Sequence, residues 1–140
     1  MTHVEKATEL FYEKFNCSQA VLGAYAKDFG MSEEDAFRVA LCLSGGMRKG
    51  EVCGAVSGAL MVIGLKYGQA SADGKAVSYE KATEFMDKFK KENGSYICKE
   101  ILEYDISTAD GMKNASEKNL FKTVCPKMVE SAVKILEEII

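Results

Sequence analysis

The sequence predicts an all-α fold, a single-domain multi-helix bundle around a central, glycine-rich apolar helix at about residues 52–67. Three observations support this fold class. Apolar residues recur at helical spacing, cap-like residues separate the successive periodic stretches, and alternating β-branched runs are missing. With 140 residues, 47% of them hydrophobic and 28% charged, the chain is expected to form one helical domain over residues 1–140.

The start of the first helix is marked by a capping box. Thr2 with Glu5 forms this pattern, in which each residue's side chain bonds to the other's backbone N–H. The residues that follow place a continuous apolar face on one side of the predicted helix: Val4, Ala7, Leu10, Phe11 and Phe15. We expect the chain to break at Asn16.

Two further helices and a loop are predicted before the central helix. Asn16 repeats the capping pattern and predicts a second helix over 17–29, and Ser32 begins a third over 33–43. The segment LSGGMRKGE, residues 43–51, holds three glycines, which make a regular helix costly. It is therefore expected to be a loop.

The central helix is apolar on nearly every side, which is typical of a helix buried in the middle of a bundle. Its apolar stretch, Val52–Leu65, is shorter than the roughly 20 residues needed to cross a bilayer. Gly50, Gly54 and Gly58 recur at intervals of four, so that small residues lie along one stripe. The stripe favours close packing of a neighbouring helix, with close approach of a cofactor or substrate as the alternative.

The second half of the chain is predicted in less detail. A fifth helix is expected over 78–91, and Ser95 is expected to cap a sixth over 96–105. Residues 106–123 show no clear periodicity and are expected to form a long loop with one short helix. Pro126 is expected at the first position of a last, amphipathic helix that ends the chain.

Charge and the N-terminal sequence exclude several classes of function. Lys plus Arg number 18 and Asp plus Glu 21, and this net charge of -3 gives no footprint for nucleic acid or an anionic membrane. The N-terminal residues lack a targeting pattern, so we expect a cytoplasmic protein. His3, the only histidine, is expected on the surface, which leaves Cys-His or Ser-His hydrolysis without a base.

The cysteine content points to chemistry at sulfur. The chain has five cysteines, a high number for a reducing compartment, where structural disulfides are disfavoured. An odd number also excludes full pairing within one chain. Thiol chemistry or metal binding is therefore expected. The five are Cys17, Cys42, Cys53, Cys98 and Cys125.

All of these except Cys42 are predicted at the cap or in the first turn of a helix. Unpaired backbone N–H groups and the positive end of the helix dipole favour a thiolate there, lowering a thiol pKa from about 8.5 to about 7 at most. Arg48 and Lys49 lie in the loop that precedes Cys53. We therefore expect Cys53 to be the most reactive thiol.

The order of the cysteines resembles that of a known family. The features that carry the resemblance are Asn16-Cys17, GEVCGAVSGALMVIGLKYG at residues 50–68, Cys98 with Glu100 and Leu102, and Cys125. Together they cover most of the chain and are similar to the bacterial and archaeal C_GCAxxG_C_C family of redox-active proteins. In this chain the central motif reads Cys53-Gly54-Ala55, so the first Gly and the Cys are transposed relative to the GCA of the family's label. The resemblance implies redox activity or metal binding at four signature cysteines, Cys17, Cys53, Cys98 and Cys125.

Three functions stay open at this point. The first, which we favour, is a thiol redox protein or thiol oxidoreductase in which Cys53 attacks and Cys17, Cys98 or Cys125 resolves. The second is a metal or iron–sulfur cluster held by the same four thiolates. The third is a non-catalytic helical interaction module whose cysteines only pack.

The motifs restrict the partners. No C-x-x-C is present, which argues against a thioredoxin-like mechanism. The first hypothesis requires a redox partner protein or a small-molecule oxidant or reductant. A homo-oligomer is also left open, because the chain ends on two isoleucines that pack either on the core or on a second subunit.

Overall fold

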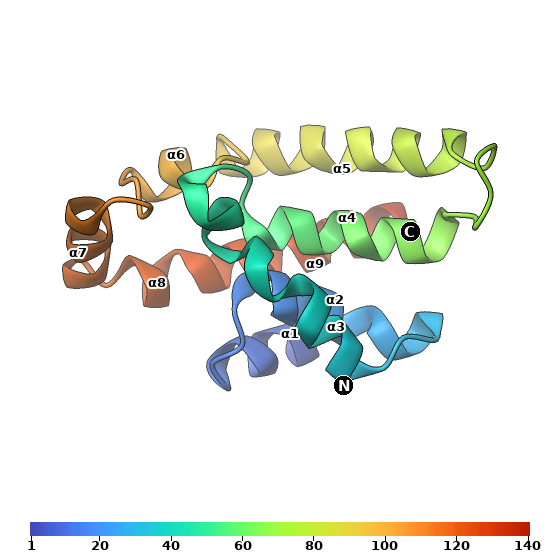
Figure 1. Ribbon diagram of the computed structural model, residues 1–140, viewed down its shortest axis with the longest axis horizontal. Coiled ribbons are helices and arrows are strands. Elements are labelled where there is room, and N and C mark those ends of the chain that lie inside the picture. The colour runs from blue at the N-terminus through green and yellow to red at the C-terminus, as the bar shows by residue number, and fades with distance from the viewer.

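The structure, a computed structural model, describes residues 1–140 and is all-α, as the sequence predicts. The apolar helix α4 (Gly54–Tyr67) runs through the middle of the molecule (Figure 1). Helix α5 (Ala76–Asn93) lies along one side of α4, α2 (Cys17–Tyr25) lies along another, and α9 (Cys125–Ile139) packs against all three. None of the helices combines the length and hydrophobicity that a bilayer crossing requires.

Capping boxes begin both N-terminal helices, as predicted. Helix α1 (His3–Tyr12) follows the Thr2 box, and α2 follows the Asn16 box. Beyond Tyr25 the second helix tightens into a 3₁₀ turn, η1 (Ala26–Phe29), so the predicted helix 17–29 is present with a narrower last turn. Together α1 and α2 form a hairpin that packs on α4 and α9.

The predicted loop before the central helix is also present. Ser32 caps α3 (Glu33–Ala40), which continues into the short 3₁₀ turn η2 (Leu41–Leu43). The chain then makes one wide turn, η3 (Gly46–Gly50), in which Met47 and Arg48 have left-handed backbones with φ of 59° and 65°. Such values are uncommon for residues other than glycine, and they gather at functional sites.

The stripe of glycines on α4 packs a neighbouring helix, as favoured from the sequence. A Cβ on Gly58 would lie 2.8 Å from the carbonyl oxygen of Ser18 and 3.2 Å from Val21 Cβ, both on α2. A Cβ on Gly54 would lie 2.5 Å from Cys17 Sγ. The two helices therefore approach as closely as they do because these positions carry no side chain.

The structure corrects the prediction for the fifth and sixth helices. Helix α5 is longer than the predicted 78–91. Helix α6 (Cys98–Leu102) is shorter than the predicted 96–105, and its N-cap is Ile97 rather than Ser95. The Ser95 hydroxyl instead accepts a hydrogen bond from Ile97 N–H at 2.9 Å and donates one to Glu100. Ser95 thus stabilises the turn that precedes the helix.

The prediction for residues 106–123 was wrong in part. The segment contains two helices, α7 (Ala109–Glu117) and α8 (Leu120–Thr123), rather than a long loop with one. The Thr108 hydroxyl caps α7 by accepting from Gly111 N–H. In addition, α9 begins at Cys125, so Pro126 occupies the second helical position rather than the first.

Helices α6, α7 and α8 form a separate unit at one end of the bundle (Figure 1). We call residues 98–124 the cap. A cluster of 24 buried residues forms the core of the protein, and none of them comes from the cap. The cap therefore contributes little to the core, and several of its apolar side chains line a cavity instead.

A closely packed glycine of α4, Gly58, and an unpacked one, Gly64, give a matched pair of variants. Gly58→Ala is expected to lower the free energy of unfolding by about 1–2 kcal/mol, because the added methyl group clashes with α2. Gly64 has open space around it, so Gly64→Ala is expected to raise it by up to about 1 kcal/mol through helix propensity. Urea unfolding of both variants measures the difference, and equal effects would contradict the close packing.

His3 takes part in a small polar cluster that joins both ends of the chain. Its ring stacks on Tyr25 with centroids 4.0 Å apart, and its two nitrogens contact Asp28 and Glu137. Partial burial lowers the pKa of His3, but hydrogen bonds and charge from these two carboxylates outweigh it and raise the pKa above its ordinary value of 6.5. Although it is partly exposed as expected, His3 links α1 to η1 and α9.

This cluster predicts a pH-dependent contribution to stability. Because the folded-state pKa of His3 is raised, its contribution is complete below the unfolded-state value near 6.5 and is lost as the pH rises through the folded-state value. His3→Ala is therefore expected to cost about 1 kcal/mol more at pH 5.5 than at pH 9. Urea unfolding at the two pH values measures this difference, and a pH-independent cost would contradict it.

Candidate functional site

A cavity of about 340 Å³ lies where the cap meets the bundle. Its walls come from the α1–α2 junction, the loop before α4, the cap and the start of α9. Four of the five free cysteines line it: Cys17, Cys53, Cys98 and Cys125. Cys42 lies outside the cavity and is exposed. The four cysteines that the sequence singled out thus share one cavity, although they are far apart in the chain.

Each of these cysteines stands at the beginning of a helix. Helices α2, α6 and α9 begin at Cys17, Cys98 and Cys125, and Cys53 immediately precedes α4. The first turn of a helix carries backbone N–H groups without an intrahelical acceptor. The cavity is therefore surrounded by several helix N-termini, each presenting a sulfur.

A short backbone bridge brings Cys53 and Cys98 together. Val52 and Ile97 form an isolated antiparallel bridge between the loops that precede α4 and α6. On either side of it, Cys53 N–H donates to the Tyr96 carbonyl at 2.8 Å and Cys98 N–H donates to the Glu51 carbonyl at 2.6 Å. Alternate residues of an extended chain point to opposite faces. Both cysteines consequently leave the bridge on one face, toward the cavity.

Glycines leave the space in which two of the sulfur-bearing residues sit. Gly54 makes room for Cys17 Sγ, as described above. A Cβ on Gly46 would lie 2.9 Å from Cys98 Cβ and 2.4 Å from the backbone nitrogen of Glu51. Any side chain at these positions would push a cysteine or its loop out of place. The glycines of the loop thus shape the cavity wall around the cysteines.

Cys17 is the cysteine whose surroundings favour a thiolate. The neighbouring Cys53 side chain is the largest influence on the pKa of Cys17, and the backbone N–H groups of Gly45 and Ser18 add to it. These contacts outweigh burial and lower the pKa of Cys17 from 9.0 to about 7. Cys17 is therefore the cavity thiol that is most readily deprotonated.

The other three cysteines are held as neutral thiols. The hydrogen bond with Cys17 and burial raise the pKa of Cys53 well above its ordinary value. Burial, followed by the Cys17 charge, raises the pKa of Cys98 to about 11 and that of Cys125 to about 12. One thiolate beside three thiols is the expected result of placing four acidic groups in one enclosed space.

These pKa values favour Cys17 rather than Cys53 as the thiolate, and neither Arg48 nor Lys49 is among the main influences on the pKa of Cys53. The Arg48 guanidinium lies against Gly45, with Nη1 donating to the Ser44 carbonyl at 3.3 Å and to the Ser44 hydroxyl at 3.4 Å. Its charge lowers the pKa of Cys98, not that of Cys53. The raised pKa of Cys53 thus gives no sign that Arg48 or Lys49 activates this thiol.

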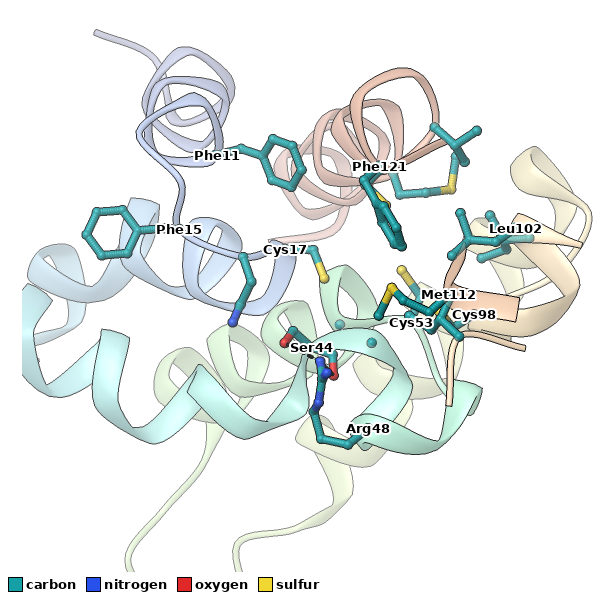
Figure 2. Close-up of a pocket in the computed structure, with 18 of the residues that line it drawn as sticks. Phe11, Phe15, Cys17, Ser44, Arg48, Cys53, Cys98, Leu102, Met112 and Phe121 are labelled. Atoms are coloured by element: carbon teal, nitrogen blue, oxygen red, sulfur yellow. Dashed lines mark hydrogen bonds between the residues drawn. The ribbon is translucent and has the colours of Figure 1, made fainter. Parts of the chain in front are cut away.

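The cap supplies most of the apolar wall of the cavity. Figure 2 shows Leu102 and Phe121 directed into the space that Cys17 faces from the opposite wall, with Phe11 beside it. Leu102 is buried, and Phe121 is half-buried. Leu102 falls within the helix predicted over 96–105, but Phe121 was not identified from the sequence, because residues 106–123 lack a helical period. The one local signal for helix α7 in this segment was its N-cap residue, Thr108.

The four cysteines do not form a metal site in this arrangement. No three side chains among the histidines, cysteines, aspartates and glutamates stand together in a geometry that would hold one metal ion. A zinc ion or iron–sulfur cluster held by thiolates requires such convergence. The side chains as they stand therefore do not make up a site for a single metal ion.

Comparison with known proteins agrees with the position of the cysteines. The sequence model of the family described as "Putative redox-active protein (C_GCAxxG_C_C)" matches residues 15–139. The chain belongs to the C_GCAxxG_C_C family. The match includes all the cavity cysteines of this C_GCAxxG_C_C protein, and it leaves out Ile140 and residues 1–14, which contain the whole of α1. Neither a curated protein nor a solved structure matches the chain.

The lowered pKa of Cys17 can be measured by alkylation. In a Cys42→Ser background, which removes the exposed thiol, the fast phase of reaction with iodoacetamide is expected to rise with pH around a midpoint of about 7. Additional Cys17→Ser is expected to abolish this phase and leave only reaction at higher pH. A midpoint near 9, or a fast phase that survives Cys17→Ser, would contradict the assignment.

Proposed function

We propose that this chain is a thiol–disulfide redox protein in which Cys17 attacks the substrate and Cys53 resolves the mixed disulfide. One observation carries the proposal: Cys17 and Cys53 line the same cavity, and the Cys53 side chain is the largest influence that lowers the pKa of Cys17. An attacking thiolate and a resolving thiol must be neighbours, because the two sulfurs have to form a disulfide with each other. Membership of a family described as redox-active supports the same function.

In the attack step the Cys17 thiolate displaces one sulfur of a substrate disulfide. A bond forms between Cys17 Sγ and the attacked sulfur, the substrate S–S bond breaks, and the second substrate sulfur leaves as a thiolate. The backbone N–H groups of Gly45 and Ser18 hold Cys17 in the charged form before attack. The cavity walls position the substrate against this sulfur.

In the resolving step Cys53 gives up its proton to the departed thiolate and attacks Cys17 Sγ. The Cys17–Cys53 disulfide forms, the mixed disulfide breaks, and the second substrate thiolate leaves and takes a proton from water. The protein has then supplied two electrons, and the substrate disulfide has become two thiols. Reduction of the Cys17–Cys53 disulfide by an external dithiol returns the protein to its starting state.

The raised pKa of Cys53 is compatible with this role, because its first cause is Cys17 itself. Both the hydrogen bond with Cys17 and the Cys17 charge hold the pKa of Cys53 high. A mixed disulfide on Cys17 removes that charge. The pKa of Cys53 then falls, while the Ala55 N–H continues to stabilise its thiolate. Attack by Cys17 thus activates Cys53 at the moment when it is needed.

Cys98 and Cys125 have a different place in the proposal. With pKa values raised to about 11 and about 12, both remain protonated at neutral pH and do not compete with Cys17 for the substrate. Cys98 lies beside Cys53 across the Val52–Ile97 bridge. It is therefore the better placed of the two to exchange with a Cys17–Cys53 disulfide.

Dithionitrobenzoate distinguishes the two roles. In a Cys42→Ser background the fast phase should release about two thionitrobenzoate equivalents, one on attack and one on resolution. Cys53→Ser is expected to release about one and to retain a mixed disulfide on Cys17, and Cys17→Ser should lose the fast phase. Cys125→Ser is the control and should behave like the parent.

Other results would contradict the proposal. If Cys53→Ser still released two equivalents, another thiol would be the resolving residue. If neither Cys17→Ser nor Cys53→Ser changed the reaction, the cysteines would serve only packing, as in a helical interaction module. Thermal unfolding of each variant separates loss of reactivity from loss of the fold.

A further inference from the structure

The cavity is larger and more apolar than exchange between two neighbouring thiols requires. Its volume of about 340 Å³ lies at the lower end of the range for small-molecule sites. At roughly 30 Å³ for each water-sized group, it has room for about a dozen heavy atoms. That is the size of a compact organic molecule, and it is too small for a helix or strand of a partner protein.

The cap is built around this space and not around the core. No residue of the cap belongs to the 24-residue core, yet Leu102, Ile106, Met112 and Phe121 all line the cavity. Leu102 and Phe121 project toward the same space from different helices of the cap (Figure 2). Apolar side chains gathered around a cavity favour an apolar occupant, because its burial removes their surface from water.

Apart from the Cys17 thiolate, the charged side chains that line the cavity are all cationic. Lys14 and Arg48 line it, and no aspartate or glutamate does, although the chain has more acidic residues than basic ones. Arg48 makes no ion pair with a carboxylate, and only its Nη1 is hydrogen-bonded within the protein. Its remaining N–H donors are therefore available to an acceptor on a ligand. Two cations beside an apolar cavity match a molecule with an acidic group.

We propose that the cavity selects a compact, apolar organic disulfide that carries a carboxylate, and that this class of molecule is the substrate of Cys17. The proposal rests on the thiol–disulfide exchange proposed above and adds the identity of the reactant. The apolar part lies against the cap, and the carboxylate is recognised by Arg48 and Lys14. The ligand disulfide takes up two electrons and two protons and becomes two thiols. Cys17 and Cys53 give up the same two electrons and two protons and form a disulfide with each other.

Lipoate is a suitable probe, since it is a cyclic disulfide with an apolar chain and a terminal carboxylate. Lipoamide is its neutral counterpart with the same disulfide, and hydroxyethyl disulfide is a small, polar reference. The reduced protein in a Cys42→Ser background is mixed with each probe, and the rate of Cys17–Cys53 disulfide formation is followed by quenching and mass spectrometry. Lipoate is expected to react about fivefold faster than lipoamide, through its charge.

Neighbouring residues of one turn provide the matched variants. Arg48→Gln is expected to bring the lipoate-to-lipoamide ratio close to one, and Arg48→Lys is expected to restore much of it. Lys49 does not line the cavity, and Lys49→Gln should leave the ratio unchanged. Phe121→Ser should slow lipoate relative to hydroxyethyl disulfide, because it removes apolar wall from the cap.

The outcomes separate the two proposals. If hydroxyethyl disulfide oxidises the Cys17–Cys53 pair but lipoate has no advantage over lipoamide, the substrate class is wrong and the redox function stands. Equal effects of Arg48→Gln and Lys49→Gln would overturn recognition by Arg48. If none of the disulfides oxidises the pair, the redox function fails, and the substrate class fails with it.

Discussion

The close approach of α2 to α4 is the constraint on which the rest of the site depends. Gly54 and Gly58 let the α2 backbone lie directly on α4, and the sulfur of Cys17 occupies the place where a side chain at Gly54 would be. This contact sets the first residue of α2 beside Cys53, just before the start of α4. A helix packing contact of the core thereby places two thiols side by side.

The chemistry of the site follows from how four thiols share one enclosed space. A single negative charge is stabilised there by backbone N–H groups and a neighbouring thiol, and it disfavours a second charge. That charge settles on Cys17, because the Cys53 side chain and the N–H groups of Gly45 and Ser18 converge on its sulfur. Cys98 and Cys125 lack comparable support, and their raised pKa values follow from burial. The site is thus asymmetric, as a pair with distinct attacking and resolving roles requires.

The sequence predicted those parts of the molecule that local signals encode. The caps at Thr2, Asn16 and Ser32 were identifiable because capping is a short-range interaction between residues three apart. The apolar, glycine-striped α4 was identifiable by its composition. The four cysteines at helix starts followed from these elements, and so did the expectation of a shared site.

The remaining features depend on contacts that leave no local pattern. The Val52–Ile97 bridge joins two loops through one residue pair, which has no periodicity to detect. The left-handed backbones of Met47 and Arg48 turn Arg48 toward Ser44, so adjacency in sequence gave the wrong partner for its charge. For this reason the sequence pointed to Cys53 as the most reactive thiol, whereas the pKa values point to Cys17. Cys17 is activated by residues of three separate segments, which only the folded chain brings together.

The central claim is that Cys17 and Cys53 form the redox pair, and the pairing of cysteines in the oxidised protein tests it most directly. The Cys42→Ser protein would be oxidised with one equivalent of a disulfide reagent, digested without reduction, and its cross-linked peptides identified by mass spectrometry. The account predicts a disulfide between Cys17 and Cys53 as the first product. A first disulfide between any other two cysteines, or oxidation that leaves Cys17 and Cys53 free, would contradict it.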